Sequence, residues 1–329
     1  MIPHWAFALW RGRRHEPHRP CQRALRAHAG LAAKRDVAAV NALLGAQAPG
    51  LGDDCAAIPD GDGYLLFAIE GFIAQFVEAD PWFAGWCGVM VNLSDIAAMG
   101  GRAIAVADAI WAKGEAGAEP VLAGMAAAAS AYGVKVAGGH SNFRSAQGQL
   151  AVSVVGRAKK LLSSFAAQPG EVLIAAIDLR GAYRPVFDNF QAALEALPER
   201  LRGDLEILPN LAEAGLCRAA KDISQAGLVG TTAMFAECSG VGMRINPLLV
   251  PKPAEVTLER WLKSFPSYGY LLTATPENAD AVLAHFAARD IGAAVIGAVE
   301  AHGKILLDDG AQQEEIWDFG SQALMGCAV

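Results

Sequence analysis

Two periods of apolar and polar residues alternate along this chain, and the changes between them predict its elements. Apolar residues recur at three- and four-residue spacing over 31–44 and 118–132, which predicts helices. Alternating or short apolar runs predict strands, separated by turn residues such as Asp60-Gly61-Asp62-Gly63. The predicted strands are 56–59, 64–72, 102–111, 135–137 and 149–157. The first half of the chain is therefore expected to form an α+β or mixed-sheet domain.

The second half repeats this mixture of strands and helices. Its predicted strands are 171–177, 241–245, 270–274, 294–299 and 304–308. Its predicted helices are 187–197, 208–220, 225–239 and 277–288. Ser163–Gly170 has the composition of a linker. We therefore expect domains at 34–162 and 163–329, which is consistent with a length of 329 residues.

One short stretch combines helix signals with candidate chemistry. An aromatic loop is expected at 81–86, followed by a helix over 91–102 that Asn92 caps and Gly100-Gly101 ends. Asp95 would lie in the first turn. A helix N-terminus suits a phosphate, and a carboxylate beside it suits the Mg²⁺ that accompanies a nucleotide. The alternative is a plain N-cap with a favourable first-turn charge.

Composition narrows the function classes. Hydrophobic residues make up 53% of the chain and charged residues 19%, which is enough apolar material for two cores. The net charge of −7 and the isoelectric point near 5.5 argue against nucleic acid or an anionic membrane as the main partner. No apolar run reaches the length needed to cross a bilayer. An anionic substrate would need local cations or a bound metal.

The cysteines and the N-terminal segment bear on localisation. Six cysteines are scattered without a Cys-x-x-Cys pair, which fits neither a zinc site nor a disulfide framework and indicates a reducing, cytoplasmic location. Residues 1–33 carry six arginines against one acid, and we expect a disordered basic tail there. A nucleic-acid-binding arm is the alternative for this tail.

Four polar segments interrupt the apolar elements, at 52–54, 92–95, 138–141 and 221–224. Such positions, at strand ends and helix starts, are where ligand sites collect in α/β architectures. If Asp54, Asp95 and Asp222 meet, they supply the hard oxygen ligands that Mg²⁺ prefers. Gly138 and Gly139 would let the backbone approach a phosphate. The alternative for each segment is an ordinary turn or helix cap.

In this order and at these intervals, the four segments resemble the AIR-synthase-related superfamily, which includes selenophosphate synthetase and thiamine-monophosphate kinase. Gly-Asp-Asp-x-Ala-Ala begins at Gly52, and Asn-Leu-Ser-Asp-x-x-Ala-Met-Gly-Gly spans 92–101. Gly-Gly-His-Ser spans 138–141, and Asp-x-Ser-x-x-Gly-Leu begins at Asp222. The resemblance covers roughly 34–300, and the motif at 92–101 is the most specific part of it.

The resemblance implies a two-domain α+β fold of the PurM-like type. The N-terminal domain would form the interface of a homodimer with a barrel-like pair of sheets, and ATP would lie in the cleft between the domains. It implies Asp54, Asp95 and Asp222 as Mg²⁺ ligands. The nucleotide-binding positions would be Asn92, Ser94, Gly138, Gly139, His140 and Ser141, and Asp53 would act in catalysis.

Several positions depart from the family pattern. Glu70 stands where relatives have an aspartate, and its longer side chain could still reach a metal. The cysteine pair of selenophosphate synthetase is absent, and Cys21 has no partner nearby in sequence. Lys34 is in the place of that enzyme's N-terminal lysine. The substrate-side segments 178–184 and 266–271 match no characterised member, although Arg180 and Arg184 are candidate anion contacts.

The leading hypothesis is a cytoplasmic, homodimeric enzyme that uses ATP and Mg²⁺ to transfer a phosphoryl group to an unidentified small molecule. Lys34 would help stabilise the transferring group. One alternative is a non-catalytic nucleotide-binding or scaffold protein that kept the loops. Another is selenium or sulfur activation of the selenophosphate-synthetase type, against which the missing cysteine pair speaks.

Overall fold

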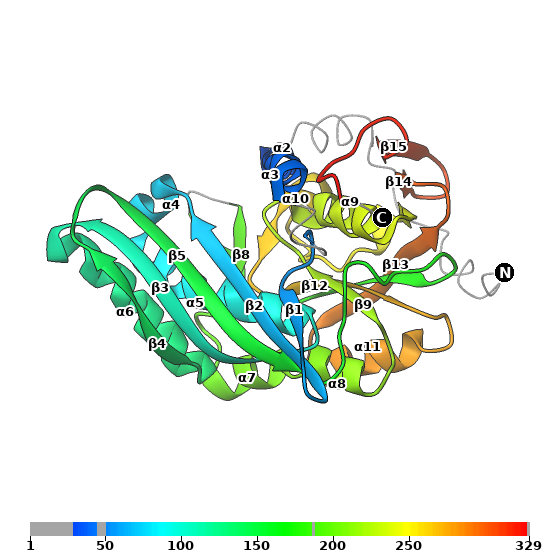
Figure 1. The fold of residues 1–329 in the computed structure, drawn as a ribbon. Coiled ribbons are helices and arrows are strands. Elements are labelled where there is room, and N and C mark those ends of the chain that lie inside the picture. The colour runs from blue at the N-terminus through cyan, green and yellow to red at the C-terminus, as the bar shows by residue number, and fades with distance from the viewer. Residues whose placement is uncertain (1–28, 45–50, 186–187, 328–329) are drawn as a thin grey trace.

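A computed structural model describes residues 29–44, 51–185 and 188–327, which fold into two α+β lobes (Figure 1). Most of the expected basic tail, with Cys21, lies outside the described residues. Two short helices precede the first lobe, α2 (Ala29–Ala33) and α3 (Asp36–Leu44). They replace the single helix predicted over 31–44 and lie beside the second lobe (Figure 1).

The first lobe is built on an open five-stranded sheet with helices on one face (Figure 1). Its strand order is β1-β2-β5-β3-β4, antiparallel except between β3 and β4. The strands are β1 (Ala56–Asp60), β2 (Gly63–Phe72), β3 (Arg102–Lys113), β4 (Lys135–Asn142) and β5 (Arg144–Ala158). The helices are α4 (Ala74–Ala79), α5 (Pro81–Ala98) and α6 (Gly114–Tyr132).

Helix α5 is the central element of this lobe. Asp80 caps it by accepting a hydrogen bond from the Phe83 backbone N–H at 3.4 Å, and Pro81 occupies its first turn. Every residue from 83 to 98 is buried. The predictions of an aromatic loop at 81–86 and of an N-cap at Asn92 are therefore wrong. Asn92 lies well inside one long helix, because the Asp-Pro start signal precedes the aromatic residues.

The second lobe is built on a seven-stranded mixed sheet in the order β15-β14-β10-β13-β6-β12-β9. Its strands are β6 (Val172–Ile177), β9 (Ala219–Asp222), β10 (Gly242–Ile245), β12 (Gly269–Ala274), β13 (Gly292–Glu300), β14 (Lys304–Asp308) and β15 (Gln313–Asp318). A small sheet joins β7 (Ala182–Tyr183), β8 (Asn189–Gln191) and β11 (Phe265–Pro266). The helices are α7 (Pro198–Leu205), α8 (Ile207–Glu213), α9 (Gly227–Ser239), α10 (Leu258–Lys263) and α11 (Ala279–Ala287), with a 3₁₀ turn at Pro247–Leu249.

Two predictions for this lobe are wrong, and one strand is missing from them. The helix expected over 187–197 is instead the strand β8 with a following turn. The helix expected over 208–220 ends at Glu213, because Gly215 adopts a left-handed φ of 70° and 219–222 form β9. Strand β15 was not predicted. Short apolar runs do not distinguish a buried strand from a buried helix, which accounts for the missed β9.

Helices α5 and α6 pack so closely that glycine is required at the crossing. A Cβ at Gly124 would lie 1.8 Å from the carbonyl oxygen of Trp82, and a Cβ at Gly85 would lie 1.9 Å from that of Val121. Backbone atoms cannot yield to such an overlap as a flexible side chain can. The two glycines therefore fix the distance between the helices and, with it, the position of α5 on the sheet.

We expect Gly124→Ala to lower the free energy of unfolding by about 2 kcal/mol or more, because it forces the helices apart. Gly117→Ala, on the same helix as Gly124, is the matched control. A Cβ at Gly117 would have no neighbouring atom closer than 3.8 Å. The control should stabilise slightly, by about 0.5–1 kcal/mol, through helix propensity. Urea unfolding followed by circular dichroism measures both; equal effects would contradict the close-packing argument.

Candidate active site

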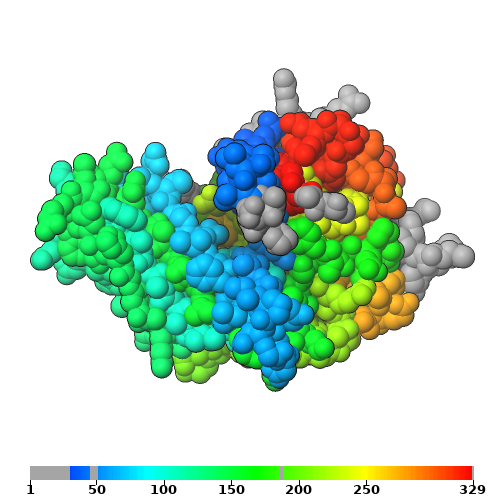
Figure 2. Space-filling view, in the orientation of Figure 1, coloured from blue at the N-terminus to red at the C-terminus, as the bar shows by residue number. Residues whose placement is uncertain are grey.

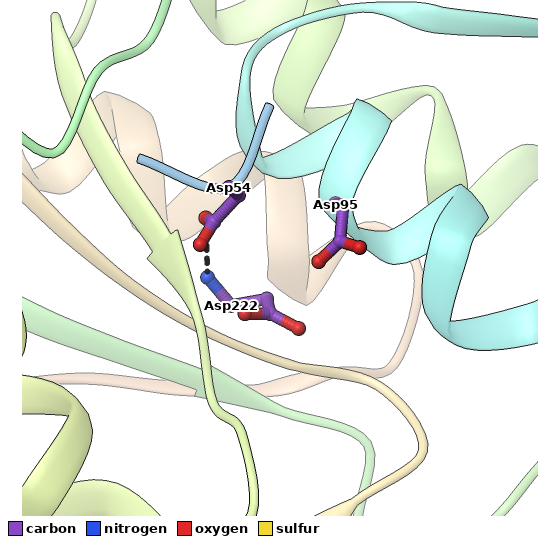
Figure 3. A group of neighbouring side chains, drawn as sticks. All are labelled: Asp54, Asp95 and Asp222. Atoms are coloured by element: carbon purple, nitrogen blue, oxygen red, sulfur yellow. Dashed lines mark hydrogen bonds between the residues drawn. The ribbon is translucent and has the colours of Figure 1, made fainter. Parts of the chain in front are cut away.

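Three carboxylates from distant parts of the chain converge between the two lobes. Asp54 lies in the loop before β1, Asp95 lies on α5, and Asp222 ends β9 (Figure 3). One oxygen atom from each lies within 4.8 Å of the others. The three predicted metal ligands therefore meet, although 168 residues separate Asp54 from Asp222.

The cluster is buried as well as acidic. Asp95 and Asp222 are 6% and 8% exposed, and the side chain of Asp54 is 5% exposed. The backbone N–H of Asp222 donates to Asp54 Oδ2 at 3.2 Å, which ties the loop before β1 to the end of β9 (Figure 3). Burying carboxylates this deeply is unfavourable unless a proton or a cation compensates.

Lys221 supplies one compensating cation, and sequence reasoning missed it. Its Nζ lies 2.5 Å from Asp54 Oδ1 and donates to the carbonyl oxygen of Gly52 at 3.1 Å. Burial opposes the charge on Lys221, but Asp54 and the neighbouring acidic groups together outweigh burial, and the pKa of the lysine is raised. The sequence feature that could have identified Lys221 is its place in an apolar strand, directly before the motif aspartate.

Two buried oxygen atoms on α5 have no hydrogen-bond partner among the described residues. These are Asp95 Oδ2 and Asn92 Oδ1, three residues apart and so on one side of the helix. The amide nitrogen of Asn92 donates to the Gly88 carbonyl at 2.8 Å, which leaves only its oxygen free. Unpartnered buried oxygens beside a carboxylate cluster are the donor set that Mg²⁺ takes, so the residues present fit this ion.

Burial raises the pKa of each clustered carboxyl group, and the neighbouring acids add to the effect. Desolvation and then Asp54 raise the pKa of Asp222 to about 8. Desolvation, followed by Asp222 and Glu70, raises the pKa of Asp95 well above its ordinary value. Desolvation also raises the pKa of Asp54, against the opposing charge of Lys221. Without a bound cation, this cluster therefore retains protons that exposed carboxyl groups have lost.

Glu70 and Lys34 lie at the edge of the cluster. Glu70 lies near the end of β2, and desolvation by its surroundings raises its pKa although the charge of Lys34 opposes this. The charge of Lys34 also lowers the pKa of Asp222. Figure 2 shows a hollow between the strands of the first lobe and helices α2 and α3, and Lys34 lies between these two helices. Both predicted residues therefore approach the site.

Asp53 binds the interdomain segment. Its Oδ2 accepts a hydrogen bond from Ser163 Oγ at 2.6 Å, and its Oδ1 accepts one from the Ser164 N–H at 2.9 Å. Both oxygens thus have partners within the chain. The contacts hold the loop that carries Asp54.

Ser94 contacts the second lobe. Its hydroxyl donates to the Tyr270 hydroxyl at 3.0 Å, and Tyr270 pairs with Asp222 across β12 and β9. Ser94 is 9% exposed. Its contact fixes α5 against the strand that positions the third carboxylate.

The segment 138–141 does not join the cluster within one chain. It forms part of β4, the far edge strand, rather than the expected loop, and its residues are exposed. Gly139 shares a row of the sheet with Glu70, three strand spacings or about 14 Å away. His140 lies beside the ring of Trp111, with a centroid distance of 6.2 Å. Binding of a nucleotide at the cluster by these residues would require a longer reach or a second copy of the chain.

The two candidate anion contacts already have acidic partners. Arg180 Nε lies 2.8 Å from Asp178 Oδ1, and its NH2 lies 3.3 Å from Asp204 Oδ2. Arg184 Nε lies 2.5 Å from Asp80 Oδ2, and its guanidinium stacks over the ring of Phe83. Both arginines join the second lobe's substrate-side segment to neighbouring elements. An anion would have to displace a carboxylate to bind there.

The open sheet covered by helices, the second mixed sheet and the acidic cluster between them define a two-domain α+β protein of the PurM-like type. The model of the AIR synthase related protein N-terminal domain matches residues 52–158, and that of the C-terminal domain matches 182–309. This chain belongs to the AIR synthase related family. None of the described helices is both long and apolar enough to span a membrane.

Relatives of this chain include two that align over most of its length. "Uncharacterized protein sll0787" of Synechocystis sp. is 43% identical over 84% of this chain and 86% of its own. "Uncharacterized protein MJ0640" of Methanocaldococcus jannaschii is 36% identical over 75% of this chain and 77% of its own. The family relationship therefore extends across both lobes.

Solved structures share the fold at low sequence identity. PurL of T. maritima complexed with AMPPCP superposes with a TM-score of 0.72 at 17% identity, over 89% of this chain and 50% of that chain. AaThiL complexed with AMPPCP and TMP superposes with a TM-score of 0.65 at 18% identity, over 85% of this chain and 96% of that one. This chain thus spans half the length of that PurL.

The raised carboxyl pKa values predict a pH dependence of stability without divalent cations. The pKa of Asp222 is higher in the folded state than in the unfolded state, so its protonated carboxyl group favours folding. This contribution to stability is fully present below pH 4 and is lost as the pH rises through about 8, the folded pKa of Asp222. We expect Asp222→Asn to be more stable than the wild type at pH 8 in EDTA, with a free energy of unfolding higher by about 1–3 kcal/mol. Urea unfolding measures this difference. At pH 4 the difference should shrink.

Glu119→Gln, on the exposed face of α6, is the matched charge-neutralising control and should behave as the wild type at both pH values. Equal stability of Asp222→Asn and the wild type at pH 8 would show that the carboxyl group is not destabilised by its surroundings.

Proposed function

We propose that this chain is an ATP- and Mg²⁺-dependent phosphoryl-transfer enzyme that acts on a small molecule through a phosphorylated product or intermediate. The observation that carries the proposal is the buried convergence of Asp54, Asp95 and Asp222, with an oxygen of Asp95 left unpartnered. Family membership and structural neighbours complexed with nucleotides support it.

Asp54, Asp95 and Asp222 would hold the Mg²⁺, with Glu70 at the edge and the free amide oxygen of Asn92 nearby. When bound, the ion would offset the charge of the phosphate oxygens. The carboxylates themselves would give up their protons to the solvent as the cation binds, because only the ionised form is a good ligand. Affinity for Mg²⁺ should therefore rise with pH toward about 8, the pKa of Asp222.

Two lysines would have different roles, one in positioning a carboxylate and one in stabilising charge. Lys221 keeps Asp54 in place through its 2.5 Å contact and so acts by positioning. The charge of Lys34 acts on Glu70 and Asp222, so this lysine would also stabilise negative charge on a transferring phosphoryl group. We assign Asp53 to positioning of the Asp54 loop, because Ser163 and Ser164 occupy both of its oxygens.

We also propose a homodimer formed through the outer face of the five-stranded sheet. That face is uncovered by helices (Figure 1), and it carries Ile58, Phe67 and Ile69, which are 50%, 48% and 63% exposed. Neighbouring positions in the same rows, such as Ala105 and Ala107, are small and apolar. A sheet that is apolar on both faces is expected to be covered on both. Such pairing would also bring a second copy of 138–141 near the site region.

A second candidate is a nucleotide-binding protein without turnover. The observation that favours it is the engagement of Arg180 and Arg184 by Asp178 and Asp80, which leaves neither guanidinium free for a substrate anion. Under this reading ATP and Mg²⁺ would stabilise the fold with no product formed. Product analysis separates the two candidates.

The function is tested by measuring ATP binding calorimetrically with Mg²⁺, then ADP, AMP and phosphate release across a panel of small metabolites. We expect binding that requires Mg²⁺, and turnover with at least one acceptor. Asp95→Asn should lower turnover by about 100-fold or more, because it removes a charged ligand from the centre of the cluster. Glu119→Gln should retain full activity. Absence of nucleotide binding at millimolar ATP and Mg²⁺ would overturn the proposal.

The dimer is tested by Ile69→Asp, which places a charge in the centre of the apolar face. Light scattering coupled to gel filtration should show a dimer for the wild type and a monomer for this variant, since an uncompensated charge would be buried in the interface. Leu197→Asp is the control, because Leu197 is 72% exposed at the start of α7 and away from the sheet. A monomeric wild type, or an Ile69→Asp dimer, would contradict the assignment.

A further inference from the structure

Two cysteines far apart in the sequence lie in contact in the structure. The sulfur atoms of Cys238, at the end of α9, and Cys327, in the C-terminal segment, are 3.1 Å apart. Cys238 is 2% exposed and Cys327 is partly exposed, and both are free thiols. The scattered spacing of the cysteines gave no sign of this contact.

The pair packs directly against the loop that leads to Asp54. Cys238 Sγ lies 3.5 Å from the Gly52 carbonyl oxygen, and Cys327 Sγ lies 3.6 Å from that of Leu51. A Cβ at Gly52 would lie 2.8 Å from one sulfur and 2.6 Å from the other. Gly52 also has a φ of 119°, which side chains rarely adopt. The loop therefore follows the surface that the two thiols form.

The C-terminal segment is held so that the thiols stay together. The carboxylate of Glu237, the residue before Cys238, accepts backbone hydrogen bonds from Leu324, Met325 and Gly326 at 2.8, 2.6 and 3.2 Å. Asn41 Nδ2 donates to the Met325 carbonyl at 2.9 Å. A disulfide needs the sulfurs to approach by about 1 Å, to roughly 2 Å.

We propose that Cys238 and Cys327 are a modification site, a thiol pair that a small-molecule disulfide oxidises reversibly to an intrachain disulfide. The bond would join the C-terminal segment to α9. It would also restrict the movement of the loop from Leu51 to Asp54, whose backbone packs against the two sulfurs. This inference does not depend on the proposed function, because it rests on the position of the two sulfurs.

The chemistry balances with oxidised glutathione as the oxidant. Cys327, the more exposed sulfur, loses its proton to the solvent and attacks one sulfur of glutathione disulfide, releasing a glutathione thiolate. Cys238 then loses its proton and attacks Cys327 Sγ in the mixed disulfide, releasing the second glutathione. Two protein thiols are oxidised, and one glutathione disulfide is reduced to two thiols. Contact with Cys238 lowers the pKa of the Cys327 thiol, which is consistent with its role as the first nucleophile.

The test uses the full chain equilibrated with glutathione disulfide, then denatured for thiol counting and peptide mass mapping. The chain has six cysteines, so oxidation should leave four free thiols and a peptide pair linked through Cys238 and Cys327. The melting temperature should rise by about 5 °C, because the bond closes a long loop in the unfolded chain. Dithiothreitol should reverse both changes.

Cys327→Ser should keep five free thiols under the same treatment. Cys238→Ala should keep four, because Cys327 then remains joined to one glutathione as an unresolved mixed disulfide. Neither variant should show the rise in melting temperature. Cys217→Ala, which removes a buried cysteine elsewhere, should still lose two thiols. Cys327 lies near the end of the chain, so its variant tests the site even if Cys238→Ala does not fold. Six thiols after oxidation, a bond that includes another cysteine, or disulfide-linked dimers would overturn the proposal.

Discussion

The arrangement of this protein depends on like charges buried at the junction of its two lobes. Three carboxylates lie within reach of a single ion, and Lys221 compensates only one of them by direct contact. Carboxylates this far from water remain ionised only if something else offsets their charge. The raised pKa values of Asp95 and Asp222 are the electrostatic expression of that constraint. Such a cluster lowers the free energy of unfolding of the chain, and this is typical of sites that bind a ligand.

The cluster exists because α5 serves two purposes at once. Its whole length from 83 to 98 is buried, so it forms the core of the first lobe and the contact with the second. Close packing against α6 at Gly85 and Gly124 fixes it on one side, and the contact between Ser94 and Tyr270 fixes it on the other. Asp95 therefore has little freedom to move away from Asp222. The same packing that stabilises the lobe holds the carboxylate in an unfavourable environment.

The sequence predicted the meeting of Asp54, Asp95 and Asp222 better than it predicted the elements that carry them. Polar motifs between apolar runs identified the residues, and the family resemblance implied a shared role for them as Mg²⁺ ligands. The helix around Asp95 begins earlier than predicted, because its aromatic first turns resemble a loop and its cap, Asp80, precedes them. Lys221 and the pair of Cys238 and Cys327 were missed for another reason. The contact of Lys221 with Asp54 spans 167 residues, and that of Cys238 with Cys327 spans 89. Such contacts depend on tertiary packing and cannot be predicted from the local spacing of residues.

The two halves of the site differ in how tightly the fold constrains them. The carboxylates lie on a buried helix, a sheet strand and a loop held by Lys221 and by the Asp53 contacts, so a change at any of them disturbs the core. The segment with Arg180 and Arg184 is instead held by ion pairs whose arginines are partly exposed, although Asp178, the partner of Arg180, is buried. Neither ion pair includes one of the three clustered carboxylates. Under the proposed function, this separation places the search for a substrate around 178–184 and 266–271.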